Sequence, residues 1–304
     1  MTIQSPIAWG LDQLRLGAES LGSAPADAYW PQSARQAGVP AIRRRIGPAD
    51  LREALVRGLD DFRANRTDVV FLCVMYPVIG LVLGYAASGD GLMPLLFPLA
   101  AGFALVGPVA AIGLNEMSRR REQGEAVGWT AAFGVLRSPA IGSIVLLAAL
   151  LAAIFLVWLV IAEAIYAVTL GTAPPVSAGA FAHAVFLTGP GWALIVVGIA
   201  VGFVFAVGVF AISVVSFPML LDANVGVDVA VRTSIATVRA NPRTMALWGV
   251  IIAGGLVLGS IPLLVGLAVV LPVLGHATWH LYRRVVVVQP DASDENERIL
   301  KATP

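Results

Sequence analysis

The stretch Val238-Arg239-Ala240-Asn241-Pro242-Arg243 closes a weakly amphipathic segment and leads directly into a long apolar run. Two related stretches, Phe62-Arg63-Ala64-Asn65-Arg66 and Leu136-Arg137-Ser138-Pro139, stand in the same position before other apolar runs. A charged helix end that leads into about 20 apolar residues is typical of a segment that enters a lipid bilayer. The sequence therefore predicts an integral membrane protein built from three related units.

The composition agrees with this interpretation. Of the 304 residues, 58 % are hydrophobic and 13 % are charged, which is more apolar and less charged than an ordinary soluble domain. The net charge of +1 gives no reason to expect a nucleic-acid partner. The single cysteine, Cys73, excludes an intrachain disulfide and a cysteine-based zinc site, and we expect it to be a small buried residue.

Six apolar runs are long enough to be read as membrane-spanning helices. They lie at about 68–87, 92–115, 140–163, 191–216, 244–260 and 262–282. Only Ser260-Ile261-Pro262 separates the last two, and we predict a tight hairpin there because roughly 40 apolar residues exceed any single span. Part of the connection after the third run, around 177–187, is predicted to be a short helix at the membrane interface.

The runs form three repeats, at about 50–121, 126–222 and 227–284. Residues 108–120 align without gaps on 272–284 with four of thirteen positions identical, and Glu116 falls opposite His280. The predicted fold is an all-α polytopic membrane protein with six transmembrane helices, arranged as three parallel surface-helix-plus-hairpin repeats. The predicted surface helices are 51–65, 126–138 and 227–240; the membrane domain is 43–288, between mobile cytoplasmic tails at 1–42 and 289–304.

Arginine placement predicts the orientation. The connections on one side of the six runs carry the basic residues and those on the other side carry none, so the positive-inside rule places both termini in the cytoplasm. Arginine supplies every basic residue except Lys301, a composition that favours a bacterial source and hence the inner membrane. Four arginines that close the surface helices are expected at the depth of the lipid phosphates: Arg63, Arg137, Arg239 and Arg243.

The sharpest candidate for chemistry is the pair His276 and His280, because a separation of four residues puts both imidazoles on one helix face, a spacing that can bind a metal ion. Glu116 and Asp222 end two other spans at the same depth, so the four residues are predicted to form one polar pocket. Each of these residues also has a structural interpretation that involves no ligand. The histidines would hydrogen-bond between helices or extend to the lipid headgroups, Glu116 would pair with nearby arginines, and Asp222 would cap a helix.

Other polar residues have simpler interpretations. Glu163 ends the third run near the exterior face, where we expect it to be exposed to water, the alternative being a functional acid inside the membrane. His183 lies in the exterior connection and is expected to be an interfacial residue. Nothing in the chain resembles a phosphate-binding loop, a catalytic triad or a nucleophile elbow. We therefore predict no catalytic residue, no bound cofactor and no enzymatic activity.

Three blocks of the sequence carry a family resemblance: GLNEMSRR at 113–120, SFPMLLD at 216–222 and LPVLGHATWHLYR at 271–283. They resemble the signature blocks of a proteobacterial family of unknown function, whose members are predicted six-helix integral membrane proteins, some labelled "cytochrome c oxidase subunit I-like". Only one span carries histidines, too few for haem held as in an oxidase. More distantly, the unit of surface helix, Asn-Pro and hairpin is similar to the membrane domain of some glycerophosphodiester phosphodiesterases. The resemblance implies topology and no chemistry.

Three functions remain open at this point. The first is a non-enzymatic scaffold, assembly factor or accessory subunit of a membrane complex, with membrane lipids and other membrane proteins as partners. The second is a carrier of a lipid or small solute through a three-unit helical bundle. The third is a membrane enzyme that uses His276, His280 and Glu116. The absence of catalytic motifs and the short exterior connections favour the first.

Overall fold

The computed structural model describes residues 41–42, 46–64, 98, 107–109, 111–125, 127–173, 175, 177–223, 225–262 and 265–287. All of them belong to one compact unit that runs from Pro40 to Gln289. The first predicted span, most of the second, Cys73 and nearly all of both predicted tails lie outside the described residues, so the six-span count remains a prediction.

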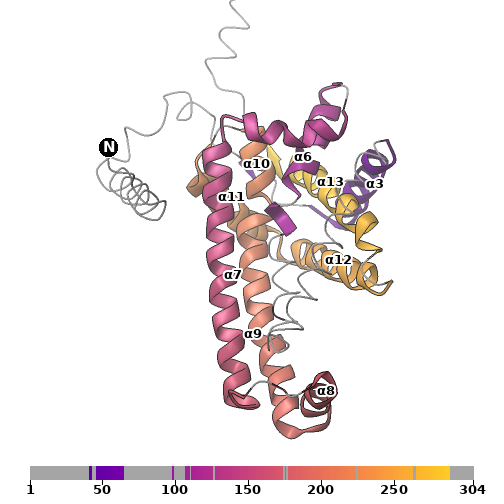
Figure 1. The fold of residues 1–304 in the computed structure, drawn as a ribbon. Coiled ribbons are helices and arrows are strands. Elements are labelled where there is room, and N and C mark those ends of the chain that lie inside the picture. Colours follow the sequence, from indigo (N-terminus) through magenta and orange to yellow (C-terminus); the bar gives the residue numbers. More distant parts are fainter. Residues whose placement is uncertain are drawn as a thin grey trace, which may run out of the picture. The chain divides into compact units, whose positions relative to one another are not determined.

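The described chain is almost entirely helical, as the apolar runs predict (Figure 1). The α-helices are α3 Pro48–Ala64, α6 Ile112–Glu122, α7 Ile141–Thr169, α8 Ala178–Leu187, α9 Gly189–Ser213, α10 Ser216–Asp222, α11 Val227–Ala240, α12 Pro242–Ser260 and α13 Leu267–Val285, with the 3₁₀ helix η2 Trp129–Arg137. Two short strands, β1 Ala41–Ile42 and β2 Val286–Val287, pair in an antiparallel manner.

Among the described helices, three are long and apolar enough to cross a membrane. They are Ile141–Thr169, the continuous stretch Gly189–Asp222, and Pro242–Ser260, which correspond to the third, fourth and fifth predicted spans. The helix α13 occupies the position of the sixth span but is less apolar, because His276, His280, Arg283 and Arg284 lie in its second half.

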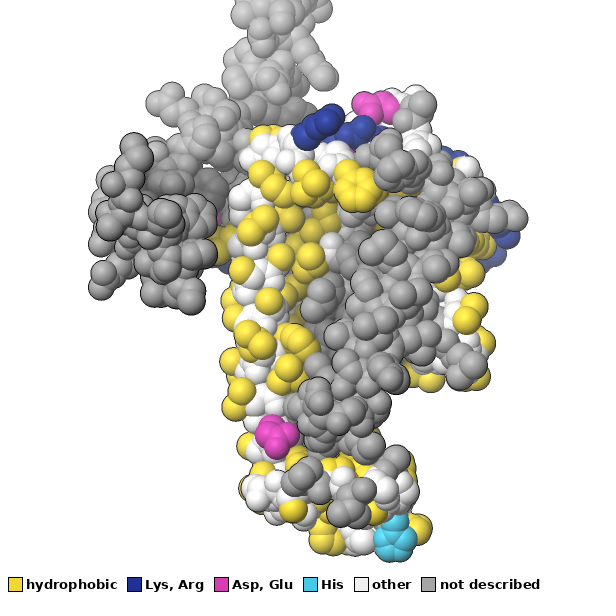
Figure 2. All heavy atoms as spheres, in the orientation of Figure 1, with side chains coloured by type: hydrophobic (Ala, Val, Ile, Leu, Met, Phe, Trp, Pro, Cys, Tyr) yellow, Lys and Arg dark blue, Asp and Glu magenta, His cyan; other side chains and the backbone are white. Residues whose placement is uncertain are grey.

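The helices α7 and α9 lie side by side, with α8 at the turn between them (Figure 1). Trp158 of α7 is buried against Phe205, with ring centroids 5.6 Å apart, and a Cβ at Gly202 would come within 3.1 Å of the indole. Elsewhere both helices expose apolar side chains. Figure 2 shows hydrophobic side chains along α7 and arginines gathered near the end where it begins, as expected for a segment that enters a bilayer there.

The helix α7 ends six residues later than the predicted boundary at Glu163, whose side chain lies exposed within the last two turns. The residues that follow Glu163 stay apolar, so nothing in them stops the helix. Gly171 provides the stop, because its φ of +95° is a backbone conformation that favours glycine just beyond a helix end. The short helix predicted around 177–187 is α8, capped by the Ser177 hydroxyl, which accepts from the amide of Ala180.

The predicted hairpin near Ser260 is present as two separate, contacting helices, α12 and α13. The turn is tight because two glycines face each other: a Cβ at Gly266 would lie 2.8 Å from the carbonyl oxygen of Gly259. Any larger residue at either position would push the helices apart.

The helix α13 packs along α3, a pairing of segments more than 200 residues apart in the chain. A Cβ on Gly58 would lie 2.6 Å from the backbone nitrogen of Ala277 and 2.8 Å from the carbonyl oxygen of Val273, so the two backbones nearly touch. Phe62 continues this contact into a small core with Leu114 and Met117 of α6. The predicted surface helix 51–65 is therefore held against other helices on its buried face.

The other two predicted surface helices are also present, as η2 and α11. The segment at 126–138 is a 3₁₀ helix and starts later than predicted, after Gly128. The side chain of Asn241, which follows α11 in the repeated stretch, accepts a hydrogen bond from the amide of Ile46 at 3.1 Å, and the hydroxyl of Thr244 donates to the Ile46 carbonyl at 2.8 Å. These bonds tie the start of α3 to the junction of α11 and α12.

Candidate functional site

Asp61 of α3 is the centre of a buried polar group that reaches into α6 and α13. Its Oδ2 accepts hydrogen bonds from the Ser118 hydroxyl at 2.6 Å and from Nε2 of His280 at 2.8 Å. Its Oδ1 accepts from Nη1 of Arg121 at 2.8 Å. His276 completes the group, with Nδ1 2.8 Å from the Ser118 hydroxyl. We call these five residues the Asp61 cluster.

The cluster keeps Asp61 ionised in a buried position. Burial by itself raises the pKa of the Asp61 carboxyl, but the hydrogen bonds from His280 and Ser118 and the nearby imidazoles lower it more, so the pKa lies below its usual value. The Ser118 hydroxyl has one proton, which it donates to the carboxylate; it therefore accepts from the Nδ1–H of His276. Nε2 of His276 is then buried with no hydrogen-bond partner among the described residues.

The last turn and a half of α13 makes a second set of side-chain hydrogen bonds and ion pairs with neighbouring helices. Tyr282 and Arg283 both donate to Oδ2 of Asp222, at 2.8 Å and 3.0 Å. Glu122 of α6 accepts from Nε1 of Trp279 at 2.9 Å and from Nε of Arg283 at 3.2 Å. One turn of α13 thus ties α6 to α10, while Arg284 pairs with Asp50 and Glu53 of α3.

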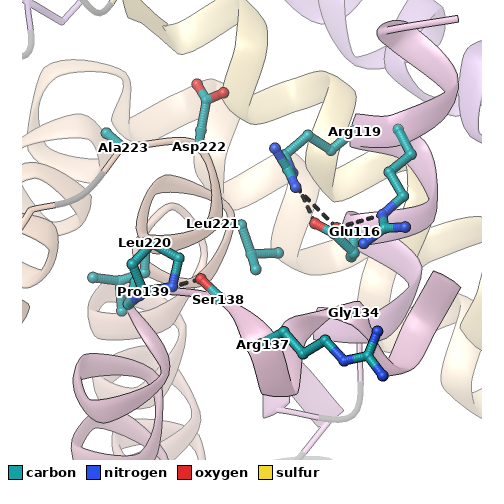
Figure 3. Close-up of a pocket in the computed structure, with 12 residues that line it drawn as sticks. Glu116, Arg119, Gly134, Arg137, Ser138, Pro139, Leu220, Leu221, Asp222 and Ala223 are labelled. Carbon is teal, nitrogen blue, oxygen red and sulfur yellow. Dashed lines mark hydrogen bonds and ion pairs between the residues drawn. The ribbon is translucent and has the colours of Figure 1, made fainter. Parts of the chain in front are cut away.

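A cavity of about 310 Å³ lies where α6, the start of α7 and the end of α10 meet. Its lining residues are Glu116, Arg119, Arg120, Gly134, Arg137, Ser138, Pro139, Ala140, Leu220, Leu221, Asp222 and Ala223. We call it the arginine pocket (Figure 3).

The carboxylate of Glu116 lies buried in this wall and is held by two arginines. Arg119 donates from Nε at 2.7 Å and from Nη2 at 2.9 Å, and Arg120 donates from Nε at 2.7 Å. Burial raises the pKa of Glu116, but the bonds from both guanidinium groups outweigh this and lower it below its usual value. Of the two interpretations of Glu116, the ion pair is the one observed.

The four residues predicted to share one pocket are divided between these groups. Glu116 and Asp222 both line the arginine pocket, yet Asp222 comes from the opposite wall and its carboxylate points away from Glu116 in Figure 3. His276 and His280 belong to the Asp61 cluster instead. The division arises because α3 packs on α13 and brings its own carboxylate, Asp61, to the histidine face.

The predicted metal ligands His276 and His280 make hydrogen bonds to Ser118 and Asp61. Within the described part of the chain, no group of three or more His, Cys, Asp or Glu side chains could hold a metal ion. His183 is exposed on α8. Of the four predicted surface arginines, Arg63 pairs with Asp60 at 3.5 Å, Arg137 lines the pocket, and Arg239 and Arg243 are exposed.

Sequence reasoning missed Asp61, Ser118 and Arg121. The sequence analysis gave Asp61 no role, but Ala54, Gly58 and Asp61 follow one another at spacings of four and three and share a helix face. That stripe of small residues, which lets another helix approach closely, was the available signal that Asp61 points inward.

Comparison with known proteins covers part of the chain. Residues 96–222 match the family described as "Predicted integral membrane protein (DUF2189)". The matched region includes α6 to α10 and all but one of the residues that line the arginine pocket, whereas α3 and α11 to α13 lie outside it. Neither the curated proteins nor the solved structures contain a match to the chain. With three helices able to cross a bilayer, this similarity identifies an integral membrane protein with several apolar helices.

Proposed function

We propose that the protein is a non-enzymatic scaffold, assembly factor or accessory subunit of a membrane complex in the bacterial inner membrane. The observation that carries the proposal is the Asp61 cluster, in which a buried carboxylate is bonded to three side chains from two other helices. Such a group fixes α3, α6 and α13 relative to one another. A rigid helical frame of this kind suits a protein that holds others in place.

The outward apolar faces of α7 and α9 support the same proposal. Only 22 % of the most apolar stretch of α7 and 6 % of that of the Gly189–Asp222 span are buried inside the protein. Val160 on α7 and Val204 on α9 are 70 % and 68 % exposed. Helix association in a bilayer depends on close packing, so faces left open by one chain are available to lipid or to another membrane protein.

The proposed topology has six spans, arranged as three parallel repeats of a surface helix followed by a hairpin, with both termini in the cytoplasm. The arginines near the start of α7 support this orientation through the positive-inside rule.

Photo-crosslinking tests the scaffold proposal. A photoreactive amino acid is placed at Val160 or Val204 in the full-length protein expressed in a bacterial host, with Leu147, which is fully buried, as the matched control. We expect one crosslinked protein of defined mass from an exposed position and none from the control. Crosslinks to lipid alone from both exposed positions would contradict the proposal.

A carrier of lipid or small solute is the second candidate, and the arginine pocket at the ends of two candidate spans favours it. Purified protein in vesicles that contain a fluorescent anionic lipid provides the test. Exchange of the lipid between leaflets faster than in protein-free vesicles would replace the scaffold proposal, whereas equal rates would leave the carrier without support.

A further inference from the structure

The arginine pocket lies at the level where two apolar spans end. Pro139 and Ala140 immediately precede α7, and Leu221 and Asp222 are the last residues of the Gly189–Asp222 span. A cavity at the ends of two spans opens at the boundary between the apolar layer and the lipid headgroups. This position makes the headgroup layer its natural surroundings.

The charges that line the cavity leave an excess of one positive charge. Three arginines and two carboxylates give 3 − 2 = +1. Glu116 is matched by Arg119 and Arg120, and Asp222 receives hydrogen bonds from Arg283 outside the lining. Arg137 has no hydrogen bond or ion pair with any residue that the structure describes, and its side chain is exposed. Its guanidinium is therefore available to an anion.

The guanidinium of Arg120, on the arginine-bearing side of the cavity, packs closely against the backbone at Gly134. A Cβ at this position would overlap Nη2 of Arg120, so only glycine lets that guanidinium lie against the backbone of η2. Arg120 uses its Nε for Glu116, and no described residue is bonded to its two terminal nitrogens. The wall therefore presents directed N–H groups from Arg120 as well as from Arg137.

The N-terminus of α7 adds an electrostatic field that favours an anion in the cavity. This helix is 29 residues long, has no acidic residue in its first turn and has no side-chain hydrogen bond at its N-cap, Ala140. The Ile141 amide donates to the Ser138 carbonyl at 3.0 Å, so the start of α7 contributes through its helix dipole, which favours a negative charge. Ser138, which also lines the cavity, has a hydroxyl that accepts from the Ala140 amide at 3.2 Å.

The wall opposite Glu116 carries Asp222, and apolar side chains lie beside it. Leu220 and Leu221 line one side of the cavity, with Pro139 and Ala140 beside them. A volume of about 310 Å³ equals roughly ten water molecules, enough for a phosphate with a few attached carbon atoms. A ligand that suits both the arginines and these apolar side chains has an anionic phosphate joined to an apolar part.

We propose that the arginine pocket binds a phosphate ester, as carried by an anionic phospholipid headgroup or by a soluble glycerol phosphate. The apolar side chains and the position at the ends of two spans favour the lipid. This inference goes beyond the scaffold function and does not depend on it.

The test uses the purified full-length protein in detergent, with lipid binding followed by native mass spectrometry. Phosphatidylglycerol is titrated against phosphatidylcholine, and glycerol 3-phosphate is titrated separately. The variant Arg137→Gln removes the free guanidinium, and Arg239→Gln removes one exposed arginine from α11 as the matched control. Arg137→Lys restores the charge without the planar guanidinium.

We expect Arg137→Gln to weaken binding of phosphatidylglycerol about tenfold, Arg137→Lys to recover part of the loss, and Arg239→Gln to bind like the natural protein. Arginine-dependent binding of glycerol 3-phosphate without preference for phosphatidylglycerol would assign the site to a soluble ester. Equal affinities for both ligands in Arg137→Gln and the natural protein would overturn the proposal. Gly134→Ala, which displaces Arg120, provides a second variant with the same expected direction.

Discussion

Asp61 shows how a single charge is accommodated between packed helices. The residue is 7 % exposed, and an unpaired carboxylate in such a position would be strongly destabilising. Three donors from α6 and α13 satisfy its two oxygens. The stabilisation depends on all partners being present, because removal of one member of a buried charged group leaves the others without compensation.

Replacing Asp61 with Asn should therefore destabilise the protein. Loss of a buried, paired charge costs about 3 kcal/mol, which corresponds to a decrease of roughly 6 to 12 °C in the apparent Tm of a protein of this size. Thermal unfolding in detergent measures the decrease. Asp60→Asn is the matched control, because its exposed pair with Arg63 should change Tm by little. Equal Tm changes for the two variants would show that the Asp61 cluster does not stabilise the fold.

Acid should remove the contribution of Asp61. Its pKa is lowered in the folded protein, so the stabilisation is complete above the ordinary value of 3.8 and is lost as the pH falls through the lower, folded pKa. The difference in Tm between the natural protein and Asp61→Asn should be smaller at about pH 3 than at about pH 5, because the Asp61 carboxylate is being protonated in that range. A difference that persists unchanged at pH 3 would mean that Asp61 is not the titrating group.

At the scale of the helix, the apolar runs predicted α9 and α12 to within about two or three residues, because hydrophobic length alone defines such segments. The prediction was less exact for α7, where only the backbone of Gly171 marks the end. The helix α13 shows a different limit. Its apolar residues predicted contact with lipid, but much of its surface is buried against α3 and α6, and hydrophobicity does not distinguish the two surroundings.

Close approach of α3 and α13 depends on Gly58. Gly58→Ala should destabilise the protein by about 1–3 kcal/mol, because the added methyl group would overlap the backbone of Ala277 and force the helices apart. Gly249→Ala in α12 is the control, since no atom lies within 4 Å of the new methyl group and alanine favours helix. Apparent Tm in detergent measures both. A stabilised Gly58→Ala variant would contradict the close packing.

At the scale of the whole molecule, one crossing by α7 should separate the ends of its flanking connections. Reporter fusions at Gln123, just after α6, and at Pro175, between α7 and α8, should lie on opposite sides of the membrane, with Gln123 cytoplasmic. An alkaline phosphatase reporter active at Pro175 and inactive at Gln123 is the expected result. The same side for both fusions would refute the proposed topology.

The candidate sites were less accessible to sequence reasoning than the helices. The pairing of Glu116 with its neighbours Arg119 and Arg120 could be foreseen, because residues three and four apart share a helix face. The contact of His280 with Asp61 joins positions 219 residues apart. Repeat alignment placed His280 opposite Glu116 and suggested a common pocket. Equivalent positions in a repeat need not meet when other residues bond each of them, and here His280 bonds Asp61 of α3 while Glu116 bonds Arg119 and Arg120.

Ala41 and Val287 pair in the short sheet, so the first and last described residues of this unit lie next to each other. The position of the chain ends can therefore be changed without changing the contacts between helices. A short linker from Val287 to Ala41, with new ends at the exposed turn of Gln123 and Gly124, would yield a circular permutant that keeps each helix beside its present neighbours. In such a permutant α13 would be synthesised before α3, so the two helices could pair early rather than waiting for the last residues of the chain.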